Sequence, residues 1–335
     1  MDGVFSDATL TLFTVSYGTL FIVGFLANSV TCVTMLTRRL RNPIDVYTFN
    51  LSLCDVIILC IYTPTQIIFI RENFAWTMGE DVCKLVNSTL PVALMCTIAT
   101  LVAMNLHYVM ELLRHPDFIA SNDERKHSFM TRVLSSRLVQ EQWKVPPGVV
   151  LLGSWVSSVS ISMPLIIKSR LDLYEKRVVI CSEGWEDERN GEMYWVALFA
   201  LTYCTPVVVL VMSYYALFQS MNKIQKRKEF SRYKKTLNVG MVLTGTFTVC
   251  NLLQHVFFFV TSTFSSTRIP KDMLPLLYTL ANMSVILQAV LNPFIYGKFR
   301  KLLQRKVTRR KSKANEKNIR SKKRRSLMAN EEGWN

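Results

Sequence analysis

Seven apolar stretches, each long enough to cross a lipid bilayer, limit most strongly what this chain can fold into. The hydrocarbon core of a bilayer needs about 20 mostly apolar residues per helix, because each backbone N–H and C=O must be paired within its own segment. We therefore expect an all-α membrane protein, a bundle of seven transmembrane helices. The stretches cover residues 10–36, 46–70, 84–113, 145–167, 193–220, 236–264 and 272–296.

The distribution of charge indicates how such a bundle is oriented. The net charge is +16, and 31 of the 40 Lys and Arg residues fall in the inter-span segments and the tail that would share the side opposite the N-terminus. The remaining segments hold 9 basic and 13 acidic residues. This is the positive-inside asymmetry of membrane proteins. We expect a multi-pass plasma-membrane protein with an extracellular N-terminus and a cytoplasmic C-terminus, in which the basic charge reflects topology rather than nucleic-acid binding.

Two of the eight cysteines differ from the others in position. Cys83 and Cys181 fall on the expected outer side, in an oxidising compartment where disulfides persist, and we expect them to be bridged. No CxxC pair, His cluster or metal-ligand spacing occurs in the sequence. The other six lie inside the apolar stretches, where a thiol packs as a small apolar side chain: Cys32, Cys54, Cys60, Cys96, Cys204 and Cys250.

We expect one membrane domain, because the sequence has no internal repeat and no soluble segment long enough to fold alone. Phe299, Leu302 and Leu303 recur at helical spacing between basic residues, as in helices that lie on an anionic membrane surface. The loop 114–144 contains either an amphipathic helix or a disordered segment. The predicted organisation is an extracellular N-terminus (1–9), a seven-transmembrane domain (10–296), a short amphipathic eighth helix (297–306) and a disordered basic cytoplasmic tail (307–335).

Four ionisable or amide side chains stand out within the predicted spans: Asn28, Asp55, Asn282 and Asn292. Polar groups in lipid are costly, so they mark function or hold helices together through hydrogen bonds. A lone buried Asp must be paired with a cation, share a proton or lie in a water-filled cavity. Both the functional and the purely structural interpretation are open at this point.

Three motifs, in order along the chain, resemble those of a known family. GFLAN at 24–28, NLSLCD at 50–55 and NPFIY at 292–296 are similar to signatures of the rhodopsin-like (class A) G-protein-coupled receptors. The resemblance implies a receptor that binds an extracellular ligand and signals to a heterotrimeric G protein, with arrestin as a further partner. It covers nearly the whole chain and includes Cys83, Trp155, Pro164, Pro206 and Tyr214.

The resemblance also implies a sodium site and a conformational switch. In the family, the Asp of the second helix and the Asn of NPxxY belong to a sodium-binding cavity, which corresponds here to Asp55, Thr97 and Asn292. Allosteric sodium is therefore expected, and no other cofactor. Pro293 removes a helical hydrogen bond and bends the last span. The positions carried over as switch residues are Asn28, Asp55, His107, Tyr108, Pro206, Tyr214, Phe247, Asn251, Asn292, Pro293 and Tyr296.

Two sequence motifs that take part in activation in the family are altered in this sequence. The DRY triplet reads HYV at 107–109, without the arginine that contacts the G protein in the family. FTVCNLL at 247–253 stands in place of FxxCWxP, so that Asn251 replaces the tryptophan and Leu253 the proline. These departures motivate an alternative function, a non-signalling or constitutively active receptor such as a scavenger or a partner subunit.

The outer segments indicate the class of ligand. Leu90 stands where receptors for biogenic amines have an aspartate, and the last span has no lysine for a retinal Schiff base. The segment 174–188, YEKRVVICSEGWEDE, begins with strand-like residues and resembles the β-hairpin loop of neuropeptide receptors. The acidic outer face favours a basic peptide, although a solvated loop would have a similar composition.

Eight residues are predicted to line the ligand site from their positions in the resembled fold. For Gln254 and His255 the competing interpretation is ordinary hydrogen bonding between helices. A transporter or channel is the remote alternative, and we expect no enzyme, because no nucleophile, base and orienting group converge. The eight are Gln66, Leu90, Glu183, Trp185, Gln254, His255, Tyr278 and Asn282.

Overall fold

The computed structural model describes residues 4–37, 40, 43–113, 145–174, 178–222, 230–263, 270, 272–295 and 297. Contacts within the chain divide it into two units, Met1–Pro293 and Phe294–Asn335. The predicted eighth helix, the basic tail and the loop 114–144 lie outside the described residues, apart from Gly297.

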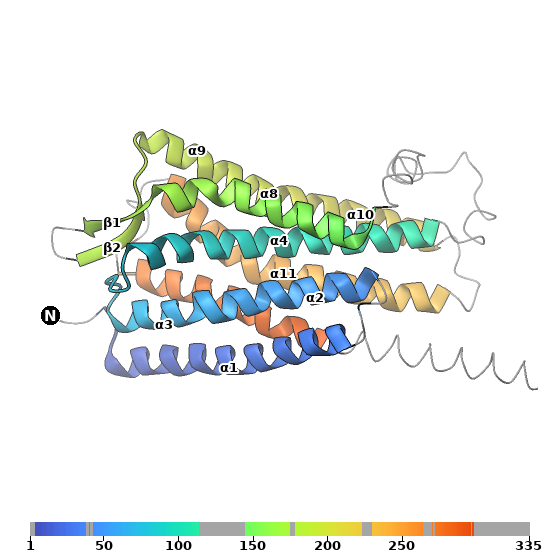
Figure 1. Ribbon diagram of the computed structural model, residues 1–335, viewed down its shortest axis with the longest axis horizontal. Helices are drawn as coiled ribbons and strands as arrows, with labels where there is room; N and C mark the ends of the chain where they lie inside the picture. Colours follow the sequence, from blue (N-terminus) through green and yellow to red (C-terminus); the bar gives the residue numbers. More distant parts are fainter. Residues whose placement is uncertain are drawn as a thin grey trace, which may run out of the picture. The chain divides into compact units, whose positions relative to one another are not determined.

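The described elements form a helical bundle with one small sheet (Figure 1). In that view α4 lies between α8 and α2, and α1 lies beside α2 and α3. The elements are α1 (Asp7–Thr37), α2 (Pro43–Ile57), η1 (Ile58–Tyr62), α3 (Thr63–Arg71), α4 (Glu80–Leu113), α8 (Pro147–Lys168), β1 (Ser169–Tyr174), β2 (Val178–Glu183), α9 (Glu188–Phe199), η3 (Ala200–Cys204), α10 (Thr205–Asn222) and α11 (Phe230–Thr263). One further helix, Leu274–Ile295, follows α11.

The prediction of seven membrane-length helices is confirmed. Seven helical segments of the described chain are long and apolar enough to cross a membrane, with α2, η1 and α3 forming one and α9, η3 and α10 another. Large apolar side chains remain exposed along the helices, for example Leu12 and Val30 on α1 and Leu152 on α8. A soluble protein would not leave such long apolar faces uncovered, whereas lipid solvates them.

Two helices contain a wide π-helical turn that the sequence analysis did not predict. The N–H of Thr63 bonds to the carbonyl of Ile58 in η1, and the N–H of Thr205 bonds to Ala200 in η3. The capping residues Thr63 and Thr205 are each followed directly by a proline, Pro64 or Pro206. Proline has no N–H to donate and its ring clashes with the carbonyl four residues earlier, so the preceding turn widens.

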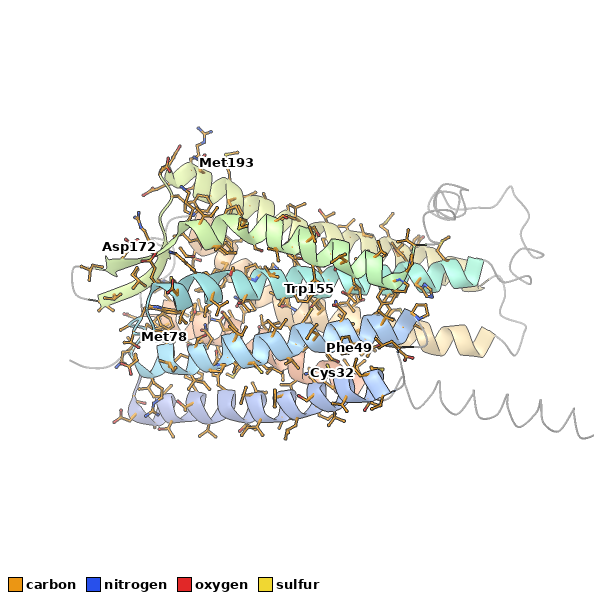
Figure 2. The ribbon with its side chains drawn as sticks, viewed as in Figure 1. Cys32, Phe49, Met78, Trp155, Asp172 and Met193 are labelled. Carbon is orange, nitrogen blue, oxygen red and sulfur yellow. A yellow bond between two sulfur atoms is a disulfide. The ribbon has the colours of Figure 1, made fainter. Side chains whose placement is uncertain are left out.

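A buried amide joins three helices in the middle of the bundle. The indole N–H of Trp155 on α8 donates to Oδ1 of Asn50 on α2 at 2.8 Å, and Asn50 Nδ2 donates to Oγ1 of Thr100 on α4 at 2.9 Å. Figure 2 shows Trp155 partway along the bundle. Polar side chains that satisfy one another across helices fix their relative position within an apolar environment. Asn50 and Trp155 are therefore residues of the fold.

Close packing of α1 against its neighbours depends on Gly24 and Asn28. Asn28 Nδ2 donates to the carbonyl oxygens of Gly24 and Ala289, at 3.0 and 2.9 Å, which supports the structural interpretation of this buried side chain. A Cβ atom on Gly24 would lie 2.9 Å from both Leu59 Cδ1 and Val290 Cγ2. Both of these neighbours are buried, so the space has no room for a side chain.

We expect Gly24→Val to lower stability by about 1–3 kcal/mol, because overpacking a buried contact displaces its neighbours. The measurement is the thermal denaturation midpoint in detergent. Gly18→Val on the same helix is the matched control, since nothing lies within 4 Å of a Cβ at that position. An equal loss in both variants would show that the β-branched residue weakens the helix itself rather than its packing.

The sheet is a two-stranded antiparallel hairpin at one end of the bundle, called here the hairpin end (Figure 1). The predicted β-hairpin is thus confirmed, but its first strand begins at Ser169, upstream of the segment identified in the sequence. Cys181 lies opposite Leu171 in β2 and forms a disulfide with Cys83 at the start of α4, as expected. The backbone N–H of Trp76 also donates to Val179 at 2.7 Å. The hairpin is therefore attached to the bundle at two points.

Candidate ligand cavity and intramembrane polar site

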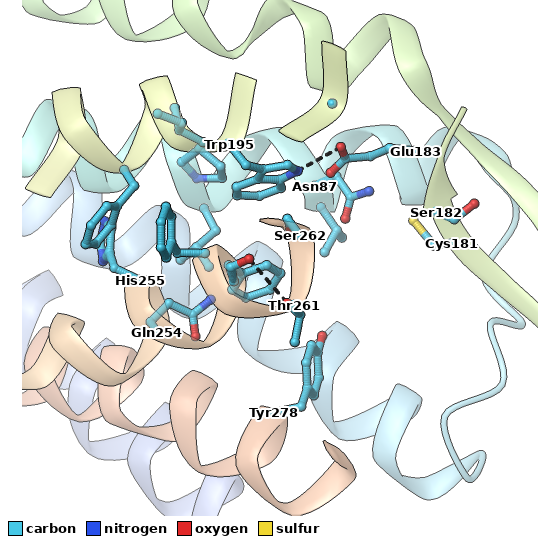
Figure 3. A pocket seen from close by; sticks show the side chains of 18 of the residues that line it. Asn87, Cys181, Ser182, Glu183, Trp195, Gln254, His255, Thr261, Ser262 and Tyr278 are labelled. Carbon is cyan, nitrogen blue, oxygen red and sulfur yellow. Dashed lines mark hydrogen bonds between the residues drawn. The ribbon is translucent and has the colours of Figure 1, made fainter. Parts of the chain in front are cut away.

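A cavity of about 680 Å³ lies at the hairpin end (Figure 3). Its walls come from α3, α4, β2, α9, α11 and the helix Leu274–Ile295. Volumes of roughly 300–1,000 Å³ are typical of ligand pockets. Aromatic and apolar side chains make up somewhat more than half of the lining residues of this cavity, and the rest are polar or charged.

The fold brings seven of the eight predicted ligand residues to this cavity. Asn282 is the exception, because its Oδ1 accepts a hydrogen bond from Tyr62 and its Nδ2 donates to the carbonyl of Tyr278. It contributes to the polar network beneath the cavity and is absent from the wall. The seven are Gln66, Leu90, Glu183, Trp185, Gln254, His255 and Tyr278.

Some residues of the cavity wall were not among the eight predicted ligand residues. Trp195, Leu198, Phe199 and Thr202 contribute to the wall at helical spacings of three, one and three along α9 and η3. That periodicity is present in the sequence, but it is equally typical of an apolar helix face packed against another helix. Only the arrangement of the helices shows that this face borders a cavity.

Glu183, the last residue of β2, is held by two tryptophans. Its Oε2 accepts a hydrogen bond from the indole N–H of Trp185 at 2.7 Å and another from the indole N–H of Trp195 at 3.0 Å, the second of which is drawn in Figure 3. Burial raises the pKa of the Glu183 carboxyl, and the two indole hydrogen bonds oppose that rise. The indole ring of Trp195 is itself packed, because it stacks on the ring of Phe258 with the two centroids 5.5 Å apart. The carboxyl group is thus fixed in orientation at the cavity wall.

Acidic groups outnumber basic ones around the cavity. Glu183, Glu188 and Glu192 line it, and Arg170 is the basic residue that does so, apart from the imidazole of His255. Arg170 Nε lies 3.0 Å from Oδ2 of Asp172, so part of its charge is already neutralised. The hydroxyl of Ser182 and this guanidinium hold the pKa of Asp172 below its usual range.

The floor of the cavity is a network of polar side chains. The hydroxyl of Tyr278 donates to Oε1 of Gln66 at 2.9 Å, and the Nδ1 atom of His255 lies 2.8 Å from the carbonyl oxygen of Asn251. That oxygen is an acceptor, so Nδ1 carries a proton, and Nε2 lies 3.1 Å from Thr202 Oγ1. The contact with Asn251 lies within α11, and the contact with Thr202 is the interhelical bond that the structural interpretation expects. Gln254 differs, since its buried Oε1 has no partner among the described residues.

A second polar site lies within the bundle. Asn292 Nδ2 donates to both carboxylate oxygens of Asp55, at 3.2 and 2.9 Å, and both residues are buried. Within the described chain, no cationic side chain pairs with Asp55. The buried hydroxyls of Ser52 and Thr97 have no hydrogen-bond partner there either.

Comparison with known proteins agrees with this architecture. The family model described as "7 transmembrane receptor (rhodopsin family)" matches residues 134–296. The chain belongs to the rhodopsin-like family of seven-transmembrane receptors. The receptor is 24% identical to human cysteinyl leukotriene receptor 1 over 246 residues, or 72% of this chain and 66% of that protein.

The other relatives are about as distant. Identity to the mouse cysteinyl leukotriene receptor 1 is 23% over 73% of this chain and 64% of that protein. Mouse neuropeptide Y receptor type 6 is 22% identical over 88% of this chain and 78% of that protein. The receptor therefore spans just under two thirds of the length of the cysteinyl leukotriene receptors that it matches.

The altered switch positions of the receptor have partners of their own. Asn251, at the place of the family tryptophan, donates from Nδ2 to the carbonyl of Phe247 at 2.8 Å and to Oε1 of Gln288 at 3.4 Å. The hydroxyl of Tyr214 lies 3.2 Å from Thr244 Oγ1, joining α10 to α11. An amide that bonds across two helices replaces the large ring of the family at this position.

The inner end of α4 is described only in part. The ring of His107 lies edge-on to Tyr47 of α2, with centroids 6.2 Å apart. The side chain of Tyr108 and the whole of Tyr296 lie outside the described residues. Pro206 lies two residues after the end of η3, and Pro293 follows Asn292 in the last helix.

The groups around Asp55 fit a sodium ion. A fully buried carboxylate without a cationic neighbour lacks a counter-ion, and the unpartnered hydroxyl of Thr97 is an oxygen of the kind that Na⁺ binds. Asn292 presents its Nδ2 to Asp55 and so orients the carboxylate. The oxygens of Asp55, Thr97 and the Asn292 amide remain the predicted ligands of the ion.

Proposed function

We propose that this receptor binds an extracellular, positively charged peptide in the cavity at the hairpin end and signals to a heterotrimeric G protein at the opposite end. The observation that carries the proposal is the cavity, whose wall combines aromatic rings with three acidic side chains. Opposite charge at the wall steers and retains a basic ligand.

The charge asymmetry of the sequence supports the orientation. With the basic inter-span segments and tail in the cytoplasm, the N-terminus, the disulfide and the cavity face the outside of the plasma membrane. A basic inner face also suits contact with anionic lipids, a G protein and arrestin. The amphipathic segment 297–306 and the basic tail 307–335 remain predictions.

The wall of the cavity favours a peptide over a biogenic amine. Leu90 lines the cavity at the place where an amine receptor has its aspartate, so the negative charge comes from β2 and α9 near the hairpin instead. Relatives of this receptor include one named for neuropeptide Y and one for cysteinyl leukotrienes. The acidic wall of this chain favours the peptide class.

An allosteric sodium ion is part of the proposal. Asp55, Thr97 and Asn292 would hold it, with Nδ2 of Asn292 orienting the carboxylate. Such an ion supplies the counter-charge that the buried carboxylate lacks. It links α2 to α4 beneath the ligand cavity.

Guanine-nucleotide exchange tests the proposal. We expect the purified receptor in lipid nanodiscs to accelerate nucleotide exchange on at least one heterotrimeric G protein when basic peptides from a tissue extract are added. The control is the same extract after cation exchange has removed its basic peptides. Failure to accelerate exchange on any of the G-protein classes, with and without the extract, would contradict signalling.

The non-signalling alternative rests on the missing arginine at position 108. If the receptor couples as proposed, Tyr108→Arg should change the rate of nucleotide exchange by less than about tenfold, equivalent to about 1.4 kcal/mol. Tyr108→Lys is the control for charge alone. A silent native receptor that gains exchange only in Tyr108→Arg would favour the scavenger or partner-subunit function instead.

A further inference from the structure

We propose that the cavity recognises a ligand with two separate groups, a guanidinium or ammonium that docks on the free oxygen of Glu183 and a hydrogen-bond donor that reaches Gln254. This inference rests on the proposed function, because it names the chemistry of the ligand for the same cavity. The two residues lie on different sides of the cavity in Figure 3.

The carboxylate of Glu183 is oriented so that one of its oxygens can accept a cationic group of the ligand. Both indole hydrogen bonds go to Oε2, and Oε1 accepts none within the described part of the chain. The residue ends β2 two positions after Cys181, whose disulfide fixes the strand to α4. A carboxylate held in this way loses little freedom when a ligand binds, so most of the interaction energy appears as affinity.

Among the residues that the structure describes, no cationic side chain forms an ion pair with this carboxylate. The lining guanidinium, Arg170, is engaged by Asp172 at 3.0 Å, and Glu188 and Glu192 add negative charge to the same wall. A partly buried carboxylate without a cation is electrostatically unfavourable, as the raised pKa of Glu183 shows. A cationic ligand group removes that cost, and a neutral or anionic ligand does not.

The rings beside the carboxylate suit the same cation. The indole N–H groups of Trp185 and Trp195 point to Glu183, which leaves the ring faces for other contacts. Trp195 is backed by Phe258, and Trp185 packs on Gly191, where a Cβ would lie 2.8 Å from the ring. A cation over an indole face is attracted by the ring, and a guanidinium also stacks there because it is planar.

Gln254 supplies the second group. Only 4% of its surface is exposed, it lines the cavity, and its Oε1 has no hydrogen-bond partner in the described structure. A buried acceptor without a partner is unfavourable, and a hydrogen bond from a ligand donor offsets that cost. Its neighbours on the floor, Gln66 and Tyr278, already bond to each other. The ligand donor is therefore directed to Gln254.

The test compares two small probes, N-acetyl-phenylalanyl-arginine amide and N-acetyl-phenylalanyl-citrulline amide, in which the blocked N-terminus leaves the guanidinium as the one cationic group, so that they differ in charge and hardly in shape. Binding is measured by calorimetry on the full-length receptor in nanodiscs, without a G protein. We expect the arginine amide to bind at least tenfold more tightly than the citrulline amide. In Glu183→Gln, which keeps an acceptor for both indoles, this preference should fall below threefold.

Two variants serve as controls. Glu186→Gln removes an acidic residue that pairs with Lys168 and does not line the cavity, so it should keep the preference for arginine. Gln254→Leu should weaken both probes by a similar factor, because it removes an acceptor and leaves the charge of Glu183. Equal affinities for the two amides, no saturable binding of the arginine amide at millimolar concentration, or an equal effect of Glu186→Gln would overturn the inference.

The pH dependence of the binding affinity provides a second test. The carboxylate must be ionised to hold the cation, so affinity for the arginine amide should fall as pH drops through the raised pKa of Glu183, at a higher pH than for an ordinary glutamate. Glu183→Gln should abolish this dependence even though Arg170, Glu188, Glu192 and Tyr194 remain around the site. A dependence that persists in that variant would assign the titration to another group and contradict the role of Glu183.

The proposal of G-protein coupling and the proposal of ligand recognition can be refuted independently. Binding of the arginine amide with the expected preference, without nucleotide exchange on any G protein, would refute the coupling and leave the recognition intact. Nucleotide exchange driven by an acidic ligand, together with equal binding of the two amides, would refute the recognition and leave the coupling intact.

Discussion

Cys83→Ser should remove nearly all folded receptor from the cell surface. The disulfide closes a chain segment with a sequence separation of 98, and a loop of that length accounts for about 5 kcal/mol in the chain-entropy estimate. That value is an upper bound here, because helices already in a bilayer are restrained before the bond forms. The bond also attaches β2, and with it Glu183, to α4. Flow cytometry with an antibody against an N-terminal epitope tag measures the surface fraction.

The controls for this prediction separate the bond from the loss of a thiol. Cys60→Ser and Cys204→Ser remove exposed free cysteines in the spans and should leave surface expression unchanged. Cys83→Ser combined with Cys181→Ser should behave as the single variant does, since both lack the same bond. Normal surface expression of either single variant, with unchanged ligand binding, would contradict a structural role for the disulfide.

Asp55→Ala should lower the thermal denaturation midpoint of the receptor by roughly 5–10 °C. The change removes an acceptor that takes two hydrogen bonds from Asn292 and leaves a buried space, which together cost about 2–4 kcal/mol. Asp55→Asn retains an oxygen for Asn292 and should lose less than half as much. Fluorescence-detected denaturation in detergent measures the midpoint.

Sodium distinguishes the ion site from a simple hydrogen-bond clamp. We expect NaCl to raise the midpoint of the native receptor relative to KCl at equal ionic strength, because the ion binds the folded state alone. Asp55→Asn and Thr97→Val should abolish the difference between the two salts. If native receptor responds equally to both salts while Asp55→Ala is still destabilised, Asp55 acts only as a clamp.

The fold was largely predictable because its signals are local. The length of each apolar stretch predicts a span, and the asymmetry of Lys and Arg predicts an orientation. The turns η1 and η3 were missed, although Pro64 and Pro206 mark them. A proline in a span either kinks the helix or is accommodated by a wider turn, and packing against neighbouring helices decides between the two.

The candidate site was predictable by position and not by chemistry. The family resemblance predicted Gln254 and Tyr278 as ligand residues, and both line the cavity. It could not show that Gln254 Oε1 has no partner among the described residues, whereas His255 has two. It also placed Asn282 in the wall, where the hydrogen bond from Tyr62 draws it into the network below. Hydrogen bonds between distant segments of the chain are set by the relative rotation of helices, which the sequence of one helix does not contain.

By itself the sequence determined the seven spans, the pairing of Cys83 with Cys181 and the family, because span length, charge asymmetry and ordered motifs can be read along the chain. The tertiary structure alone decided the environment of Glu183. Its two tryptophan partners stand 2 and 12 residues further along the chain, and the nearer one was predicted only as a neighbour in the wall. Their convergence on one carboxylate oxygen requires the hairpin, α9 and the disulfide to be in place together. The physical reason is that orientation and burial of a side chain depend on every element packed around it.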